Sequence, residues 1–182
     1  MNHISIKKGH NIKIRGCPDP EIITIPLPDK VSICPNQFRG VKPKLIVKEG
    51  DDVKIGSPLF FDKLKPQVMW PSPASGKITE IKYGERRVID SIEISRDDNL
   101  FIKRKTFSLE EIKKSDRKTI IDQILEANLF PLIRQRPFNK VADPNQNPRD
   151  IFISGHNSAP LAVDLFNLID SNKNIFQSFC MR

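Results

Sequence analysis

The sequence predicts an α+β protein, and three successive patterns along the chain support this fold class. Short runs of alternating apolar and polar residues, separated by turns containing Pro and Gly, fill residues 1–105. Helical spacing of apolar residues follows within 106–148, which ends in a linker rich in Pro and Asn. Residues 149–182 begin with a strand, a glycine and a helical pattern. We therefore expect a β-rich domain, a helical segment with a linker, and the start of a Rossmann-like α/β domain.

The most informative stretch is residues 47–76, in which short apolar strands alternate with tight turns. Turn residues occupy 48–51, 56–58 and 71–76, and the apolar run at 59–61 predicts a strand. The pattern EGD-x-V-x-x-G-x-x-L, followed by a Pro- and Gly-containing turn and a β run, resembles half of a biotinyl/lipoyl-like domain. This resemblance implies a barrel-sandwich hybrid fold for residues 1–105.

Further strands are expected on both sides of that stretch. They are placed at residues 22–25, 31–33, 44–47, 78–82 and 88–94. Many of the 15 prolines fall before residue 36, and proline disfavours helix there. The first part of the chain should therefore consist of strands and turns.

Two helices are expected in the middle segment. Ser108 and Glu111 have the spacing of a capping box, and Ser115-Asp116 opens a second helix whose end is marked by Asn128 and then by Pro131. The apolar positions of the second helix are Ile120, Ile121, Ile124 and Leu125. They share one face, which we assign to the core in preference to a partner groove. A strand at 150–155 and a helix at 160–169 should follow the linker at 142–148.

Composition limits the classes of function. The 182-residue chain has a formal net charge of +8, which suits nucleic acid, anionic lipid, an acidic protein partner or simply a solvated basic surface. Nucleic-acid binding has weak support, because a single Trp and a single Tyr give no aromatic-basic interleaving. No run approaches the roughly 18 apolar residues of a transmembrane helix. Residues 1–16 lack a signal-peptide core, so we expect a cytosolic chain or one bound to a cytosolic structure.

No catalytic or metal site is expected from the sequence. Cys17, Cys34 and Cys180 lie far apart and form no CxxC pair, which disfavours a disulfide framework, a zinc site or an iron–sulfur cluster. His3 and His10 have no second ligand at a useful spacing. The segment at 155–158 does not satisfy G-x-S-x-G, and no GxGxxG or Walker A motif occurs.

One lysine suggests carrier chemistry. Lipoyl domains present a modified lysine in an Asp-Lys turn at the tip of a hairpin, and Asp62-Lys63 occupies nearly that place. Against this, residues 65–70 are expected to form a connection longer than the tight hairpin that displays such a lysine. A stand-alone lipoyl- or biotinyl-type carrier modified at Lys63 therefore remains the alternative function.

Three longer blocks resemble one family over residues 6–164. The blocks are VKPKLIVKEGDDVKIGSPLFFDK, PSPASGKITEIKYGERRVIDSIEI and LIRQRPFNKVADPNQNPRDIFISGHNSAPLAVD. They are similar to the A subunit of the sodium-translocating NADH:ubiquinone reductase, Na⁺-NQR. The segment from Arg134 to Val141 is the most particular to that family.

The resemblance implies a peripheral subunit on the cytoplasmic side of the bacterial inner membrane. The complex oxidises NADH, reduces ubiquinone and pumps Na⁺, and this family of subunits is associated with the ubiquinone-reduction step. Its partners would be the integral-membrane and flavin-bearing subunits, with ubiquinone as a further candidate and no nucleic acid. FAD, FMN and the iron–sulfur centre would lie on sister subunits, and this chain alone is not expected to be catalytic.

Two departures from the family pattern stand out. Family members are considerably longer, so the chain is expected to be a truncated form. Residues 158–165 also insert residues and lose a final proline relative to a loop of the family. Any quinone or subunit contact made by the missing half is left open.

Arg134, Arg136 and Lys140 surround Phe138, and this group is the expected interface element. An aromatic side chain flanked by cations is a plausible anchor on a partner surface. The alternative is that Phe138 packs between domains while the arginines are solvated. No quinone-site residue is assigned.

Overall fold

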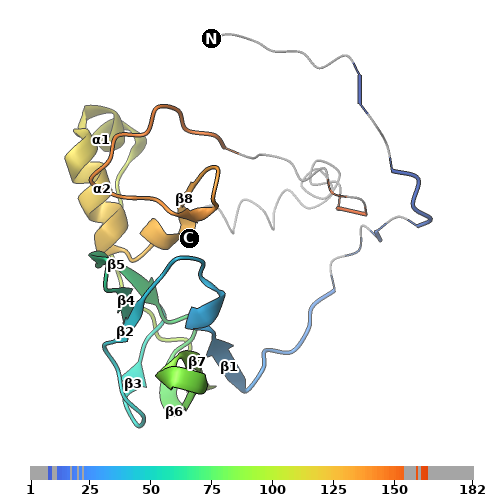
Figure 1. The fold of residues 1–182 in the computed structure, drawn as a ribbon, viewed down its shortest axis with the longest axis vertical. Coiled ribbons are helices and arrows are strands. Elements are labelled where there is room, and N and C mark those ends of the chain that lie inside the picture. Colours follow the sequence, from blue (N-terminus) through green and yellow to red (C-terminus); the bar gives the residue numbers. More distant parts are fainter. Residues whose placement is uncertain are drawn as a thin grey trace. The chain divides into compact units, whose positions relative to one another are not determined.

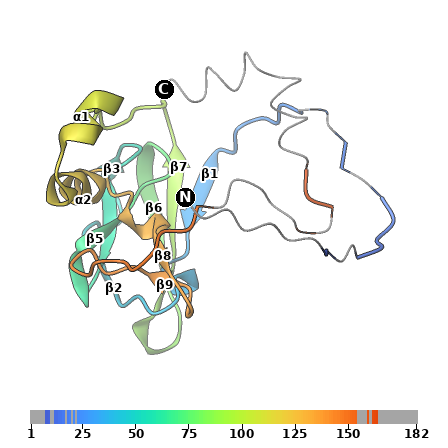
Figure 2. The same ribbon diagram turned by 90° about the horizontal axis from the view of Figure 1, so that it is seen from above.

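The computed structural model describes residues 8–9, 12–16, 18–19, 21, 23–153, 159 and 161–163. The chain divides into two units: Pro26–Asn147, and Met1–Ile25 together with Pro148–Arg182. All helices and strands of the described residues lie in Pro26–Asn147 (Figures 1 and 2).

Two antiparallel sheets form most of the unit Pro26–Asn147. The first has the order β1–β7–β6–β3, with β1 at Lys30–Ile33, β7 at Ile89–Arg96, β6 at Gly76–Tyr83 and β3 at Asp52–Val53. The second has the order β2–β4–β5, with β2 at Pro43–Leu45, β4 at Pro58–Asp62 and β5 at Lys65–Pro71. The predicted β-rich domain is confirmed.

The core takes buried side chains from both sheets. Phe60 of β4 and Trp70 of β5 stack with ring centroids 5.0 Å apart and an interplanar angle of 11°. Phe38 lies beside Trp70, with centroids 5.4 Å apart. The strands alternate as the sequence predicts, and Ile78, Ile92 and Ile94 of the other sheet join the same cluster.

Gly76, at the start of β6, occupies a position that requires glycine. Its φ is +138°, and an added Cβ would overlap the backbone carbonyl oxygen of Ser95 on the neighbouring β7. A side chain would therefore meet both backbone strain and a rigid neighbour. Gly76 thus allows the third predicted turn to enter a close-packed strand pair.

The two expected helices form, and the first has the predicted capping box. Helix α1 spans Leu109–Lys114, and the Ser108 hydroxyl and Glu111 carboxylate make both bonds of a capping box. Helix α2 spans Arg117–Glu126, and Asp116 accepts a hydrogen bond from the Thr119 amide at 3.0 Å. The bond to the Ser108 backbone holds the pKa of Glu111 below its ordinary value. The bonds to Thr119 do the same for the pKa of Asp116.

The helical segment packs on the β domain. Ile121, Ile124 and Leu125 of α2 contact the hydrophobic core, as the apolar face predicts. Three short elements complete the unit: η1 (Pro35–Gln37), η2 (Glu85–Arg87) and η3 (Phe130–Leu132). A final hairpin pairs β8 (Arg134–Gln135) with β9 (Lys140–Val141). Phe130 and Val141 are each 4% exposed and belong to the same core.

Three expectations about local structure are wrong. Residues 65–70 are not a long connection, because they lie within β5, directly paired to β4. Residues 23–25 of the expected strand at 22–25 form no strand, and Ile23 and Ile25 are 74% and 76% exposed beside Pro26, which lacks an amide donor. Residues 150–153 also form no strand, since no neighbouring strand pairs with them within the described chain. The helix expected at 160–169 falls largely outside the described residues.

Candidate functional site: two adjoining hairpin tips

The tip of the β8–β9 hairpin carries the four residues predicted to form an interface. Arg134 is half-buried and donates from Nη2 to the backbone carbonyl of Asn139 at 2.6 Å, which braces the turn. Arg136, Phe138 and Lys140 are exposed, and Phe138 keeps 64% of its surface in contact with solvent. The structure therefore places three of the four side chains where a partner could reach them, while Arg134 supports the hairpin.

The tip of the β4–β5 hairpin is a two-residue turn formed by Lys63 and Leu64. Asp62, only 3% exposed, shapes this turn. Its Oδ1 accepts hydrogen bonds from the amides of Lys42 and Leu64, both at 3.1 Å. An aspartate that accepts from an amide two residues later is typical of a tight turn. This role of Asp62 was not predicted from the sequence, although an Asp directly before a two-residue turn is a signal for it.

The side chains of Lys63 and Leu64 project from that turn. Lys63 is exposed, and its amide donates to the carbonyl of Lys42 at 2.8 Å. Leu64 is 61% exposed. The structural argument against a displayed lysine is therefore wrong: the hairpin is as tight as a displayed lysine requires.

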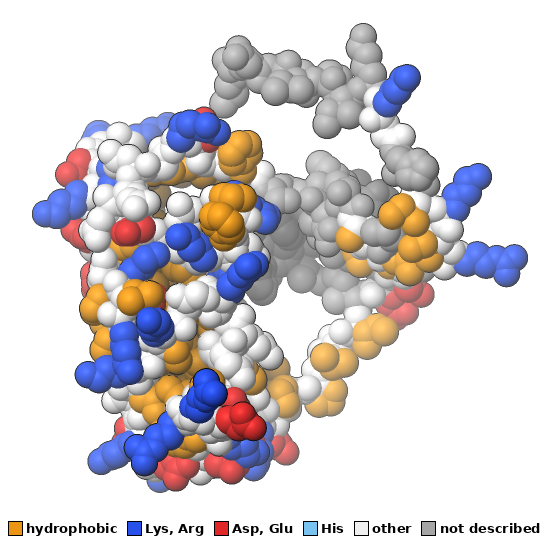
Figure 3. Space-filling view, in the orientation of Figure 1, with side chains coloured by type: hydrophobic (Ala, Val, Ile, Leu, Met, Phe, Trp, Pro, Cys, Tyr) orange, Lys and Arg blue, Asp and Glu red, His pale blue; other side chains and the backbone are white. Residues whose placement is uncertain are grey.

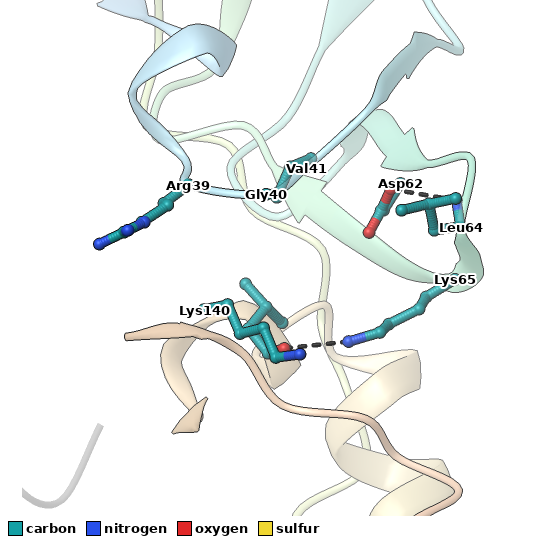
Figure 4. A pocket seen from close by; sticks show the side chains of 8 residues that line it. Arg39, Gly40, Val41, Asp62, Leu64, Lys65 and Lys140 are labelled. Atoms are coloured by element: carbon teal, nitrogen blue, oxygen red, sulfur yellow. Dashed lines mark hydrogen bonds between the residues drawn. The ribbon is translucent and has the colours of Figure 1, made fainter. Parts of the chain in front are cut away.

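The tip of the β4–β5 hairpin adjoins strand β9 and residues 39–41 across a small cavity, shown in Figure 4. The Nζ atom of Lys65 donates to the carbonyl oxygens of Val141 at 3.0 Å and Ala142 at 3.2 Å. The cavity has a volume of about 120 Å³ and is lined by residues 39–41, by Asp62, Leu64 and Lys65, and by Lys140 and Val141. Pockets that enclose drug-sized ligands usually measure about 300–1,000 Å³. The space thus suits a small group, such as a few waters or one anion, better than a flavin or a quinone.

The surroundings of the cavity are strongly basic. Figure 4 shows the side chain of Lys65 reaching across toward the β8–β9 hairpin, where Lys140 also lies, while the guanidinium of Arg39 points away into solvent. The single carboxylate of the lining, on Asp62, is held by two amides. Lys65 is bonded to backbone carbonyls, and neither Lys65 nor Lys140 has a carboxylate within ion-pair distance among the described residues.

Other candidates for chemistry do not come together in the described part of the chain. That part has no group of three or more His, Cys, Asp or Glu that could hold a metal ion. Cys34 is a free, half-buried thiol. His3, His10, Cys17, Cys180 and the segment 155–158 lie outside the described residues.

No helix among residues 23–153, nor in the other described fragments, is long and apolar enough to cross a membrane.

The arrangement of two sheets with a shared core, built from the 47–76 hairpin motif, defines a barrel-sandwich hybrid domain. Comparison with known proteins gives the same result: the NqrA N-terminal barrel-sandwich hybrid domain matches residues 4–97, and the NqrA second alpha/beta domain matches residues 115–180. The chain belongs to the NqrA family, the A subunits of the Na⁺-translocating NADH-quinone reductases. This confirms the family indicated by the sequence blocks.

The curated relatives are named as A subunits of this reductase. The A subunit of the Na⁺-translocating NADH-quinone reductase of Yersinia pseudotuberculosis serotype O:1b is 36% identical over 95% of this chain and 39% of its own length. Its counterpart in Tolumonas auensis is 34% identical over 95% of this chain and 39% of its own. The A subunit of Neisseria meningitidis serogroup C is 36% identical over 88% of this chain, which corresponds to 36% of its own length. The chain thus spans less than two fifths of the length of these relatives.

Proposed function

We propose that the chain acts as part of a peripheral subunit of a respiratory, Na⁺-pumping NADH:ubiquinone oxidoreductase. The observation that carries the proposal is the match to two consecutive NqrA domains, together with 36% identity to an NqrA protein over 95% of this chain. Its partners would be the integral-membrane and flavin-bearing subunits of the complex, at the cytoplasmic side of the bacterial inner membrane. Arg136, Phe138 and Lys140 offer an exposed interface element for docking at that membrane.

We assign the flavins and the iron–sulfur centre to the other subunits. The three cysteines are scattered at Cys17, Cys34 and Cys180, and the sequence contains no nucleotide-binding fingerprint. The contribution of this chain is then structural support for the ubiquinone-reduction step. The 120 Å³ cavity between the hairpin tips is too small to be assigned to ubiquinone.

The test is purification of the affinity-tagged chain from membranes of its native host. The expected result is recovery of the other Na⁺-translocating NADH-quinone reductase subunits in constant ratio, together with NADH-dependent ubiquinone reduction. Recovery of the tagged chain without them, while those subunits are present in the same membranes, would overturn the proposal. A tagged cytosolic protein of similar charge serves as the control for non-specific capture.

A carrier module modified at Lys63 is the second candidate, and the hairpin geometry favours it more than the sequence does. Lys63 is exposed at a two-residue turn and follows a buried aspartate, Asp62. The intact mass of the native chain decides this question. A lipoyl or biotinyl adduct that disappears in Lys63→Arg would support the carrier function, and an unmodified mass would eliminate it.

A further inference from the structure

We propose that the β4–β5 and β8–β9 hairpins, together with residues 39–47, form a surface that binds the anionic headgroups of a lipid bilayer. The twin-tip surface, as we name it, consists of residues 39–47, 61–67 and 133–142. This proposal goes beyond the proposed function. It rests on that function in one respect only, which is that a membrane lies near the chain. Lipid binding is a property of this chain by itself and is measurable without any other subunit.

Contacts between the three segments make the surface continuous. Lys65 bonds to the carbonyls of Val141 and Ala142, and the amide of Lys63 bonds to the carbonyl of Lys42. A Cβ added to Gly40 would lie 4.0 Å from the Cβ of Lys140. Segments that are far apart in the sequence therefore meet on one face.

The charge of this surface is one-sided. The three segments contain eight Lys or Arg residues and a single acidic residue, Asp62, which is buried and bonded to backbone amides. Six of the cations are exposed: Arg39, Lys42, Lys44, Lys63, Arg136 and Lys140. None of the eight forms an ion pair among the described residues. Asp143, the acidic residue that directly follows the segment 133–142, accepts a hydrogen bond from the amide of Asn145. Lys44 lies over the ring of Phe61, with its Nζ 5.7 Å from the ring centroid. Without carboxylate partners, the exposed cations can meet an external anion.

Each tip also carries one large apolar side chain at its apex. Leu64 is 61% exposed beside Lys63, and Phe138 is 64% exposed between Arg136 and Lys140. Apolar side chains flanked by lysine and arginine are typical of surfaces that insert shallowly at the boundary between headgroups and acyl chains. The cations remain with the phosphates while the apolar groups leave water.

Space-filling Figure 3 shows Lys and Arg side chains over the face of the unit that carries β8 and β2, with hydrophobic side chains between them.

The composition favours a lipid over an acidic protein as the occupant. Four of the six exposed cations are lysines, and lysine is depleted in protein–protein interfaces, where arginine and aromatic residues are enriched. Clusters of four to eight Lys or Arg are, by contrast, characteristic of binding to anionic headgroups. Each such residue close to an anionic membrane strengthens binding about fivefold.

The experiment is flotation of the full chain with two kinds of vesicle. One consists of equal parts phosphatidylglycerol and phosphatidylcholine, and the other of phosphatidylcholine alone. We expect binding to the anionic vesicles that weakens as salt is raised, with little binding to neutral ones. Equal binding to both, or none to either, would overturn the proposal.

A matched pair of charge reversals locates the surface. K63E/K140E changes both tips, whereas R86E/R87E changes net charge equally at the exposed η2 turn between β6 and β7. We expect K63E/K140E to weaken binding by about 25-fold or more, since two contributions of about fivefold are lost. R86E/R87E should weaken binding by less than about threefold, a long-range effect of charge alone. Equal losses in the two variants would contradict the assignment.

A third variant distinguishes insertion of apolar side chains from attraction between charges. A parallel assay with the reconstituted membrane subunits distinguishes a lipid partner from a protein partner. L64A/F138A should weaken binding about tenfold without changing its salt dependence, because apolar burial is lost while the cations stay. Unchanged emission of Trp70 shows that each variant keeps its fold. If vesicles fail to bind while the reconstituted membrane subunits capture the chain and lose it in K63E/K140E, the lipid proposal is overturned in favour of an acidic protein face. That outcome leaves the proposed function intact.

Discussion

The side chain of Lys65 donates a 3.0 Å hydrogen bond to the backbone carbonyl oxygen of Val141, which lies 76 positions further along the chain. A second bond, of 3.2 Å, reaches Ala142. The ammonium thus joins the β4–β5 hairpin to β9, while Val141 itself is buried in the common core. This contact ties the β4–β5 hairpin to the end of the β8–β9 hairpin.

Removing the ammonium should therefore weaken the unit. Lys65→Met keeps the length and most of the apolar stem of the side chain but leaves the two carbonyls unpaired. The expected loss in free energy of unfolding is about 2 kcal/mol, as for hydrogen bonds to charged groups. Urea unfolding measures it, with Lys63→Met, at the exposed neighbouring tip, as the control that should change stability little. Equal effects would show that the contact does not contribute.

Gly76→Ala should destabilise the β6–β7 pair. The added Cβ would overlap the Ser95 carbonyl at a φ of +138°, so strand separation or backbone strain must follow. The expected cost is about 3 kcal/mol. Gly50→Ala is the control, because Gly50 has a φ of +88° with no atom within 4 Å of the added Cβ, and its cost should be near 1 kcal/mol. Similar costs at both sites would contradict the role of the Ser95 contact.

Phe60→Ala should leave a cavity against Trp70. Phe60 is fully buried and stacks on the indole at 5.0 Å, so the expected loss is about 3–5 kcal/mol in free energy of unfolding. Trp70 is the single tryptophan of the chain, and its emission reports the unfolding directly. Phe138→Ala, at a residue 64% exposed, should cost less than about 1 kcal/mol. A small effect of Phe60→Ala would mean that the aromatic stack is not central to the core.

Acid should weaken the contact between β1 and β7. Lys30 donates to Glu93 at 2.8 Å and Thr79 donates at 2.9 Å, and these bonds hold the pKa of Glu93 below its ordinary value of 4.5. A lowered pKa means that the stabilisation is complete above about pH 4.5 and is lost as pH falls through the lowered value. The same contact raises the pKa of Lys30, so its contribution is lost only in strong alkali.

Unfolding midpoints of the wild type and Glu93→Gln between pH 7 and pH 3 test this dependence. The two proteins should differ at neutral pH and converge in acid, because the wild type then also lacks the carboxylate. Glu85→Gln, at an exposed position of η2, should follow the wild-type profile. A constant difference between wild type and Glu93→Gln across the range would contradict the explanation.

The parts that sequence predicted best are those governed by local rules. The bonds of Ser108 with Glu111 depend on residues three positions apart, so spacing alone locates the first helix start. Ser115-Asp116 located the second start to within one residue, because a short polar side chain there is typical of an N-cap. Alternation in β6 and β7 is equally local. The expected strand at 22–25 failed for the opposite reason, since a strand requires a partner that apolar alternation does not identify.

The hairpin tips were only partly predictable. Pro66 and Pro71 made β5 look like a connection, yet it lies at the edge of its sheet, where proline is tolerated. The alternation of Val68 and Trp70, both buried, was the available indication of a strand. The element around Phe138 was proposed from sequence, whereas the approach of β9 to the β4–β5 hairpin depends on long-range contacts such as that of Lys65.

Deletion of the gene tests the proposal that this chain serves a Na⁺-pumping NADH:ubiquinone oxidoreductase. Na⁺-stimulated reduction of ubiquinone by NADH is measured in membranes of the native host, its deletion strain and the strain complemented with the gene. We predict that deletion removes this activity and that complementation restores it. Full Na⁺-stimulated activity in membranes of the deletion strain would contradict the claim.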